Sequence, residues 1–352
     1  MEMNDKNLSD KIINADPVIQ NFLNQNNLAD AVKVLLQMQR ENWRELSEGY
    51  KSLGKVQNKT FPFGGFKIKV QYNPKRITST SAKVDAESIN NRECFLCAEN
   101  LPGAQKGILY NNEYIILCNP FPIFPEHFTI SYKEHLPQRI KDSFESLLLL
   151  AKDLSKYYMV FYNGPECGAS APDHIHFQAA KKNVMPVDNE FNQLKDMYGE
   201  MIIEDNNLIL SVINDGLRKF LSIESKEIDI LKKTFNSFYE IISKILIYKE
   251  EPMMNILTYY EEKFGWRIII FLREKHRPEF YYKEGKDNFL WSPAAVDLGG
   301  ICIIPLEKDF QKISKEIIIT GFNEITISKG KFSFIKKRLK EEFRSYLLNK
   351  RI

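Results

Sequence analysis

The segment HIHFQAA, residues 174–180, is the stretch on which the interpretation of this chain rests. Polar and apolar residues alternate along it, and a period of two predicts a β-strand with one face in the core. His174, His176 and Gln178 then share one face, while the apolar residues between them point to the other. We therefore expect two imidazoles and one amide along the same wall of a cleft.

Strand-like and helix-like segments lie on both sides of this strand. Before it, we expect strands at 66–72 (FKIKVQY), 114–119 (YIILCN), 127–132 (HFTISY) and 158–163 (YMVFYN), and a leucine-rich helix over 139–158. After it, we expect a helix over 225–246, strands at 254–260 (MNILTYY), 266–272 (WRIIIFL) and 300–305 (GICIIP), and a basic helix over 331–350. This order is typical of an antiparallel α+β sheet with helices on one face.

The length of 352 residues is about twice that of a usual single domain, so the chain can hold two fused cores. We expect an N-terminal helical extension over 1–60, a first module over 61–200 and a second over 201–352. Within the extension, apolar residues over 28–53 recur at helical spacing and are followed by Gly54. They predict one amphipathic helix used for packing or for a homodimer.

Charge and composition exclude several classes of protein. Lys and Arg total 49 against 46 Asp and Glu, and a net charge of +3 argues against a large surface that neutralises nucleic-acid phosphates. No apolar run reaches the ~18 residues of a membrane helix. The first residues, MEMNDKNLSDK, resemble neither a secretory signal nor a transit peptide. We therefore expect a cytoplasmic protein with neither a nucleic-acid nor a membrane partner.

Cysteine and histidine residues indicate a metal centre in the first module. Cys94 and Cys97 form a C-x-x-C pair, the commonest half-site for zinc, and His135 and His174 can complete a Cys2His2 tetrahedron. The ligands are far apart in sequence, so the ion would join separate strands of one module. The alternative is a surface or redox pair, although the odd number of five cysteines argues against a disulfide framework.

The polar strand follows a short GAS turn at 168–170, and the combination suits attack on phosphorus. A neutral imidazole can act as the nucleophile, while the amide and the N–H groups of the turn hold phosphoryl oxygens. The alternative for His176 is a hydrogen-bonded core imidazole. The roles of His127, on a neighbouring strand, and of His276, in the basic turn REKHRP, stay open, as does that of the N-terminal helix.

Together these motifs resemble the histidine-triad (HIT) superfamily, in the branch with the pattern H-x-H-x-Q. That branch contains galactose-1-phosphate uridylyltransferases, dinucleoside tetraphosphate phosphorylases and GDP-hexose phosphorylases. CFLCAEN at 94–100 resembles its metal-binding C-x-x-C-x-x-N, NPFPIF at 119–124 its nucleotide-contacting N-D-F, and HFTISYKEH at 127–135 its H-x-L-V-I-P-K-x-H. The GAS turn, and HFQA followed by MPV at 185–187, are similar to segments of the phosphorylases.

The resemblance implies an α+β fold of two fused HIT-like modules, as in galactose-1-phosphate uridylyltransferase, the first catalytic and the second degenerate. It implies that His176 is the covalent nucleophile, that Gln178 donates to a phosphoryl oxygen, and that His174 joins Cys94, Cys97 and His135 around one structural zinc or iron ion. The implied substrate-binding residues are Arg76, Asn119, Phe121, Asn163, Gly168, Ala169, Ser170, Arg273, Lys275 and Arg277.

The glutamine has a chemical consequence, because an amide cannot act as a general acid at neutral pH. The leaving group must depart without a proton, as a phosphate or sugar phosphate does. We therefore expect a nucleotidylyltransferase or phosphorylase that acts on GDP- or UDP-hexose through a nucleotidyl-histidine, with phosphate or a sugar phosphate as acceptor. HIHFQ replaces H-P-H-G-Q and NPF replaces N-D-F of the uridylyltransferases, so base and sugar specificity stay open.

Two other functions remain compatible with the sequence. One is phosphorolysis of dinucleoside polyphosphates, which uses the same nucleophile. The other is a non-catalytic, zinc-organised protein that binds nucleotides or nucleic acid, in line with the basic C-terminal helix. A labelled covalent intermediate on His176 separates both transfer reactions from mere binding.

Overall fold

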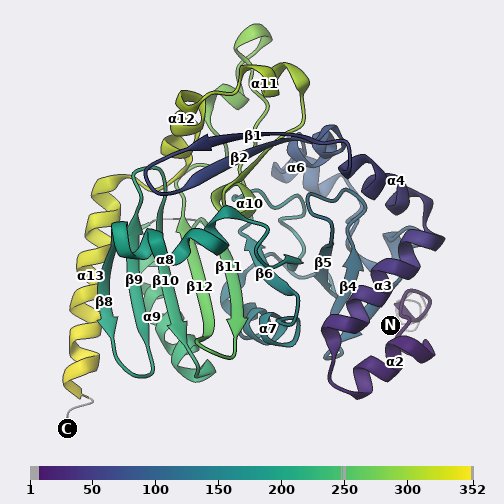
Figure 1. Cartoon of the computed structure of the whole chain (residues 1–352), viewed down its shortest axis with the longest axis horizontal. Helices are drawn as coiled ribbons and strands as arrows, with labels where there is room; N and C mark the ends of the chain where they lie inside the picture. The colour runs from purple at the N-terminus through teal and green to yellow at the C-terminus, as the bar shows by residue number, and fades with distance from the viewer. Residues whose placement is uncertain (1–7, 247, 249–250, 350–352) are drawn as a thin grey trace.

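In a computed structural model that describes residues 8–246, 248 and 251–349, the centre of the protein is one large antiparallel sheet (Figure 1). Its strands are β3 (Gly107–Tyr110), β4 (Tyr114–Cys118), β5 (His127–Tyr132), β6 (Tyr158–Asn163), β7 (His176–Lys181), β8 (Gly199–Glu204), β9 (Ile209–Asn214), β10 (Lys219–Ser225), β11 (Met254–Glu261) and β12 (Gly265–Leu272). Their order across the 10-stranded sheet is β3-β4-β5-β7-β6-β11-β12-β10-β9-β8.

This strand order consists of one topology used twice. Counted outward from the centre, the first half runs β6-β7-β5-β4-β3 and the second runs β11-β12-β10-β9-β8. If the five strands of each half are numbered in chain order, both halves have the spatial order 4-5-3-2-1. The helices α7 (Ile140–Asp153) and α9 (Ile228–Ile245) occupy equivalent places before the fourth strand of each half. The predicted α+β fold of two fused modules is therefore confirmed. The division near residue 200 stays a prediction.

The second module lacks the polar residues of β7 at the corresponding strand. Its fifth strand, β12, has the sequence GWRIIIFL where the fifth strand of the first module, β7, has HFQAAK. Because β12 carries no histidine or glutamine, the chemistry expected of the first module has no counterpart on it.

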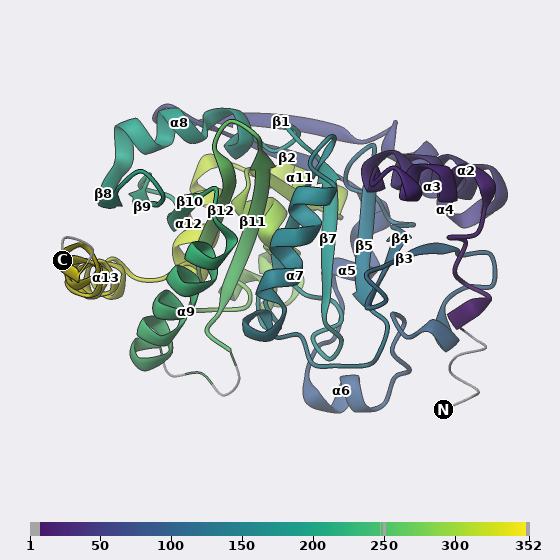
Figure 2. The same cartoon turned by 90° about the horizontal axis from the view of Figure 1, so that it is seen from below.

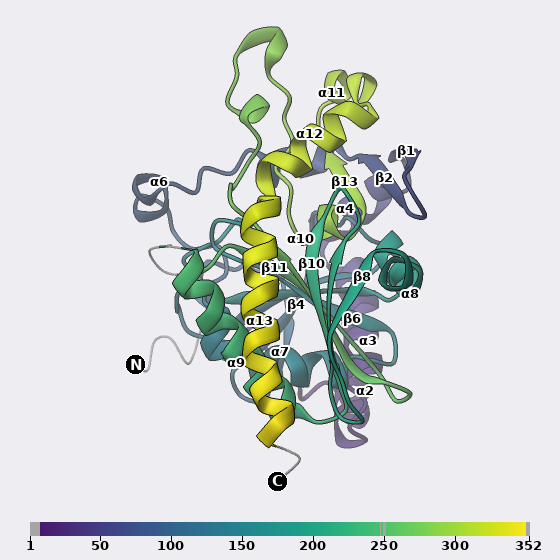
Figure 3. The same cartoon turned by 90° about the vertical axis from the view of Figure 1, so that its left-hand side faces the viewer.

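Helices cover one face of the sheet, as Figure 2 shows from below. They are α7 and α9, with α2 (Pro17–Asn24), α3 (Leu28–Asn42) and α4 (Arg44–Leu53) at one end and α13 (Lys329–Asn349) at the other. Ile175, Phe177 and Ala179 belong to the core on this face, as the alternation predicts. Figure 3 shows α13 along the outer end of the sheet, where it packs on α9 and β8.

The opposite face is also covered, which differs from the expectation of helices on one face only. A 3-stranded sheet of β1 (Gln57–Pro62), β2 (Lys67–Tyr72) and β13 (Ile301–Ile304) lies there, with β13 parallel to β2. Further α-helices outside the large sheet are α5 (Ile77–Thr80), α6 (Ala86–Asn90), α8 (Pro186–Tyr198), α10 (Ala295–Leu298), α11 (Glu307–Lys312) and α12 (Lys315–Ile325). Two segments far apart in sequence thus pair to close this face, which local pattern does not reveal.

The helix predicted over 28–53 is two helices, and this expectation was wrong. Trp43 lies between α3 and α4 with extended backbone (φ −126°, ψ 103°) and a side chain only 4% exposed. Burying the indole in the core redirects the chain. The predicted stop at Gly54 is confirmed, since Gly54 caps α4. Within the described ranges, every helix is too short or too polar to cross a bilayer.

The buried carboxyl group of Glu251 joins the two modules on the face of the sheet that α7 covers. Glu251 Oε2 accepts the Ile140 N–H at the start of α7 at 2.6 Å, and Glu251 Oε1 accepts the Tyr162 hydroxyl of β6 at 2.7 Å. Burial raises the pKa of Glu251 to about 7, against smaller opposing effects of these hydrogen bonds and of Arg139. The nearby Asp142 raises this pKa further.

This raised pKa predicts a pH-dependent stability. The folded state binds the proton more tightly than the unfolded state, so the free energy of unfolding falls as pH rises from about 4.5 to about 7, by about 3 kcal/mol. Glu251→Gln mimics the protonated acid and should flatten this part of the profile, measured by urea unfolding at several pH values. Glu240→Gln, on the exposed side of α9, is the control. An unchanged slope in Glu251→Gln would contradict the assignment.

Candidate active site and metal centre

The strand β7 lies between β5 and β6, where both neighbours hold it in register. Gln178 lies opposite Thr129 of β5 and Phe161 of β6, and His176 lies opposite Ser131. The strand begins at His176, so His174 lies just before it rather than within it. His176 is 4% exposed and His174 is fully buried.

The imidazole of His176 is held in one tautomer. Its Nδ1 lies 2.8 Å from the carbonyl oxygen of His174, and because a carbonyl only accepts, Nδ1 carries the proton. The lone pair is then on Nε2. Burial lowers the pKa of His176 to about 4, so the ring is neutral near pH 7. A neutral imidazole with a free Nε2 is a competent nucleophile.

Gln138 supports this strand and was missed by the sequence analysis. Its Oε1 accepts the His176 N–H at 2.7 Å, and its Nε2 donates to the carbonyl oxygens of His176 and Asn163 at 3.1 and 2.9 Å. This fully buried amide therefore bridges the ends of β7 and β6. A glutamine in the loop before a helix gives no sequence signal for such a role.

A cavity lies in front of Gln178 and takes residues from both modules. Its lining from the first module is Arg76, Ser79, Thr80, Ile123, Phe161, Asn163, Gly168, Ser170 and Gln178. Its lining from the segment after β12 is Ser292, Ala294, Val296, Asp297 and Ile303. The segment SPAAVDLGG, residues 292–300, thus closes the site.

Arg76 supplies a positive charge to this cavity. Its Nη1 donates to the Phe121 carbonyl at 3.0 Å, and although burial lowers its pKa to about 10, it stays protonated at neutral pH. Asn119 donates to Thr129 Oγ1 at 3.1 Å and accepts the Phe121 N–H at 2.9 Å. Asn119 and Phe121 therefore shape the loop beside the cavity, and Ile123 of the same segment is one of the cavity's lining residues.

The GAS turn packs directly against the second module. Gly168 has φ +92°, and a Cβ there would lie 2.6 Å from Ala294 Cβ, so only glycine fits. Asn163 Oδ1 accepts the Ala295 N–H at 2.8 Å. Ser170 reaches the cavity, whereas Ala169 is buried. The turn and the closing segment are thus held as one unit.

The basic residues after β12 lie in different places. Arg273 is fully buried and donates to Asn255 Oδ1 at 3.1 Å and to the Pro293 carbonyl at 2.7 Å, so it braces the closing segment from behind. Arg277 donates to Ser292 Oγ at 2.9 Å, next to the cavity. Lys275 is exposed and pairs with Glu279. None of these three lines the cavity in the described part of the chain.

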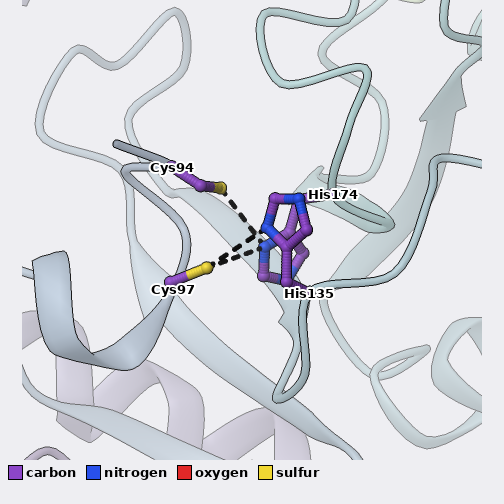
Figure 4. Close-up of side chains that lie close together, drawn as sticks. All are labelled: Cys94, Cys97, His135 and His174. Atoms are coloured by element: carbon purple, nitrogen blue, oxygen red, sulfur yellow. Dashed lines mark hydrogen bonds between the residues drawn. The ribbon is translucent and has the colours of Figure 1, made fainter. Parts of the chain in front are cut away.

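The four predicted metal ligands meet in space. Atoms of Cys94, Cys97, His135 and His174 that can bind a metal all lie within 4.8 Å of one another, and Figure 4 shows both thiols facing the two rings. The Sγ to Nδ1 distances are 3.3 Å for Cys94 and His174 and 3.3 Å for Cys97 and His135. A tetrahedral zinc ion holds S and N ligands about 3.5 Å apart, so the cluster could bind a metal.

The hydrogen bonds around the cluster support this role. His174 Nε2 lies 2.8 Å from the Tyr132 carbonyl and must donate to it, which leaves Nδ1 free to face the thiols. Backbone acceptors of this kind orient metal-bound histidines in proteins. His135, the one exposed member, has Nε2 3.7 Å from Asp173 Oδ2.

Comparisons with known proteins agree with this fold and site. Residues 35–181 match the family model "Domain of unknown function (DUF4922)", and residues 193–346 match "GDPGP1-like, C-terminal domain". Galactose-1-phosphate uridylyltransferase of Staphylococcus saprophyticus is 28% identical over 144 residues, which are 36% of this chain and 29% of that protein. The matched region therefore covers less than a third of that relative's length.

A solved structure shows the same fold. Yeast Ap4A phosphorylase Apa2, in complex with AMP, superposes with a TM-score of 0.52 over 81% of this chain and 95% of that chain, at 14% identity. The two family models and the uridylyltransferase relative support the resemblance to the HIT-like transferase and phosphorylase branch.

Removal of one ligand tests whether the Cys2His2 cluster binds a metal. Cys94→Ser should lose about one equivalent of bound metal, measured by elemental analysis, and should lower the midpoint of thermal unfolding by about 5 °C or more, because the ion ties separate segments together. Cys302→Ser alters a buried thiol outside the cluster and should keep the ion. A wild-type protein that is stable and active without metal would contradict this.

Proposed function

We propose that this protein is a nucleotidylyltransferase or phosphorylase that acts on a nucleotide sugar, GDP- or UDP-hexose, through a covalent nucleotidyl-histidine. The observation that carries the proposal is the hydrogen bond from His176 Nδ1 to the His174 carbonyl, which leaves the neutral ring with its lone pair on Nε2. The cationic Arg76 and the amide of Gln178, which is two residues from His176 on β7, support it because both line the cavity, although His176 itself is not among the described lining residues.

In the first step, His176 Nε2 attacks the α-phosphorus of the nucleotide sugar. A P–N bond forms, and the bond from phosphorus to the bridging oxygen breaks, with the electron pair leaving on the sugar phosphate. No proton is needed by this leaving group, which fits an amide rather than a third histidine beside the nucleophile. An oxygen of phosphate, or of a second sugar phosphate, then attacks phosphorus and the P–N bond breaks.

The other residues of the site stabilise charge in the transition state and hold the substrate and the closing segment in place. Arg76 and the Gln178 amide stabilise the negative charge on the non-bridging oxygens in the transition state. Ser170 and the N–H groups of Gly168 and Ala169 bind the same group or the leaving phosphate. Asn119 and Phe121 shape the nucleoside pocket, and Asn163 holds the closing segment.

The metal that we propose for Cys94, Cys97, His135 and His174 is one zinc or iron ion per chain. When bound, the ion acts structurally by fixing these four side chains. The ring of His174 faces the thiols, while its carbonyl oxygen accepts a hydrogen bond from His176 Nδ1–H. A cytoplasmic location and a possible homodimer stay predictions.

Trapping the intermediate tests the function. Wild-type protein incubated with GDP-hexose, UDP-hexose or diadenosine tetraphosphate should gain one nucleotidyl group, seen by intact mass, and lose it in acid or on addition of phosphate. The added mass identifies the nucleotide, so a gain from diadenosine tetraphosphate alone would favour the dinucleoside phosphorylase.

Variants assign the nucleophile. His176→Ala should form no adduct, with a loss of turnover of at least about 10³-fold, while His276→Asn should still form it. A wild-type chain that binds nucleotide but forms no adduct with any of these substrates would favour a non-catalytic binding protein.

A further inference from the structure

His127, whose role the sequence leaves open, contacts the amide of Gln178. It is the first residue of β5, fully buried, and its Nε2 lies 2.8 Å from Gln178 Oε1. On the other side of the ring, Nδ1 lies 3.3 Å from the backbone nitrogen of Ile123. His127 thus bridges the NPFPIF segment and the polar face of β7.

The direction of both hydrogen bonds follows from the partners. A backbone N–H can only donate, so His127 Nδ1 accepts and its single proton is on Nε2. Nε2–H then donates to an oxygen, which assigns Oε1 of Gln178 to the side facing His127. Burial, followed by the charge of Arg76, lowers the pKa of His127 to about 3, so the ring does not gain a second proton near pH 7.

The ring is also fixed in place. Phe161 stacks on it with centroids 6.1 Å apart, and Phe124 meets it edge-on at 5.6 Å. Its backbone N–H donates to the Tyr50 hydroxyl at 3.1 Å, and that residue belongs to α4 in the N-terminal extension. A Cβ on the neighbouring Gly49 would lie 2.0 Å from the Pro120 carbonyl, so α4 packs tightly on the same segment.

We propose that His127 is a positioning residue that sets the orientation of the Gln178 amide, so that its NH2 group, not its oxygen, faces the phosphoryl group in the cavity. The inference rests on the proposed function. An amide is nearly symmetric in shape, and the opposite orientation would set its oxygen against phosphoryl oxygens. A histidine with the proton on Nε2 excludes that orientation, because an N–H cannot bond to an NH2 group.

Kinetics of two variants test this role. His127→Leu removes the donor and should slow nucleotidylation of His176 in a single turnover, and kcat, by about 10- to 100-fold, with KM changed by less than about threefold. His127→Gln can still donate to Gln178 and should restore most of the rate. Equal loss in both variants, with folding and metal content intact, would overturn the proposal.

A double variant separates positioning from general damage. In a Gln178→Ala background, His127→Leu should cause no further loss, because its effect passes through the amide. Losses that multiply would show that His127 acts independently of Gln178, which contradicts the proposal. Metal content and thermal unfolding of each variant verify that it is folded.

NMR of the resting protein tests the positioning role of His127 separately from the proposed function, because it needs no turnover. In protein with 15N-labelled histidine, long-range NMR correlations should show His127 protonated on Nε2 and His176 protonated on Nδ1. Protonation of His127 on Nδ1 would overturn the positioning role even in an active enzyme. A wild-type chain that is never nucleotidylated would overturn the proposed function instead, while the spectrum still decides the tautomer of His127.

Discussion

The hydrogen bond from His176 Nδ1 to the His174 carbonyl is the interaction on which the proposed chemistry of this site depends. It spans only two residues, so it needs the backbone before β7 to be held in one conformation. Three contacts hold it: the His174 ring between the thiols and the Tyr132 carbonyl, and the Gln138 amide across the His176 backbone. A buried backbone or ring group without such a partner costs about 1–3 kcal/mol, so each contact also stabilises the fold.

The second module holds the turn and the closing segment in place. Asn255 of β11 donates to Asn163 Oδ1 at 2.8 Å and to the Cys167 carbonyl at 2.7 Å, and Arg273 donates to Asn255 in turn. Through these bonds the turn at Gly168 and the segment that closes the cavity are joined across the centre of the sheet. The second copy of the topology, whose fifth strand has no histidine or glutamine, therefore supports one wall of the cavity beside the first copy.

Several features were predictable because they are local. The alternation in 174–180 indicates which side chains face the core, and C-x-x-C with two distant histidines indicates a metal site by donor type alone. The strands predicted at 127–132 and 254–260 lie within a residue of their predicted bounds. The break at Trp43 was missed, because the apolar spacing of 28–53 is continuous and only burial of the indole decides it.

By itself, the sequence determined the strand that carries the imidazoles, the kinds of ligand in the metal cluster and the α+β class, since each follows from short-range periodicity and side-chain chemistry. Only the tertiary structure decided which other residues meet these side chains at the site. Gln138, His127 and the segment 292–297 reach the site through contacts between positions far apart in the chain, and no local period encodes such contacts. The direction of a hydrogen bond at His176 or His127 likewise depends on which donor or acceptor the fold brings to the second ring nitrogen.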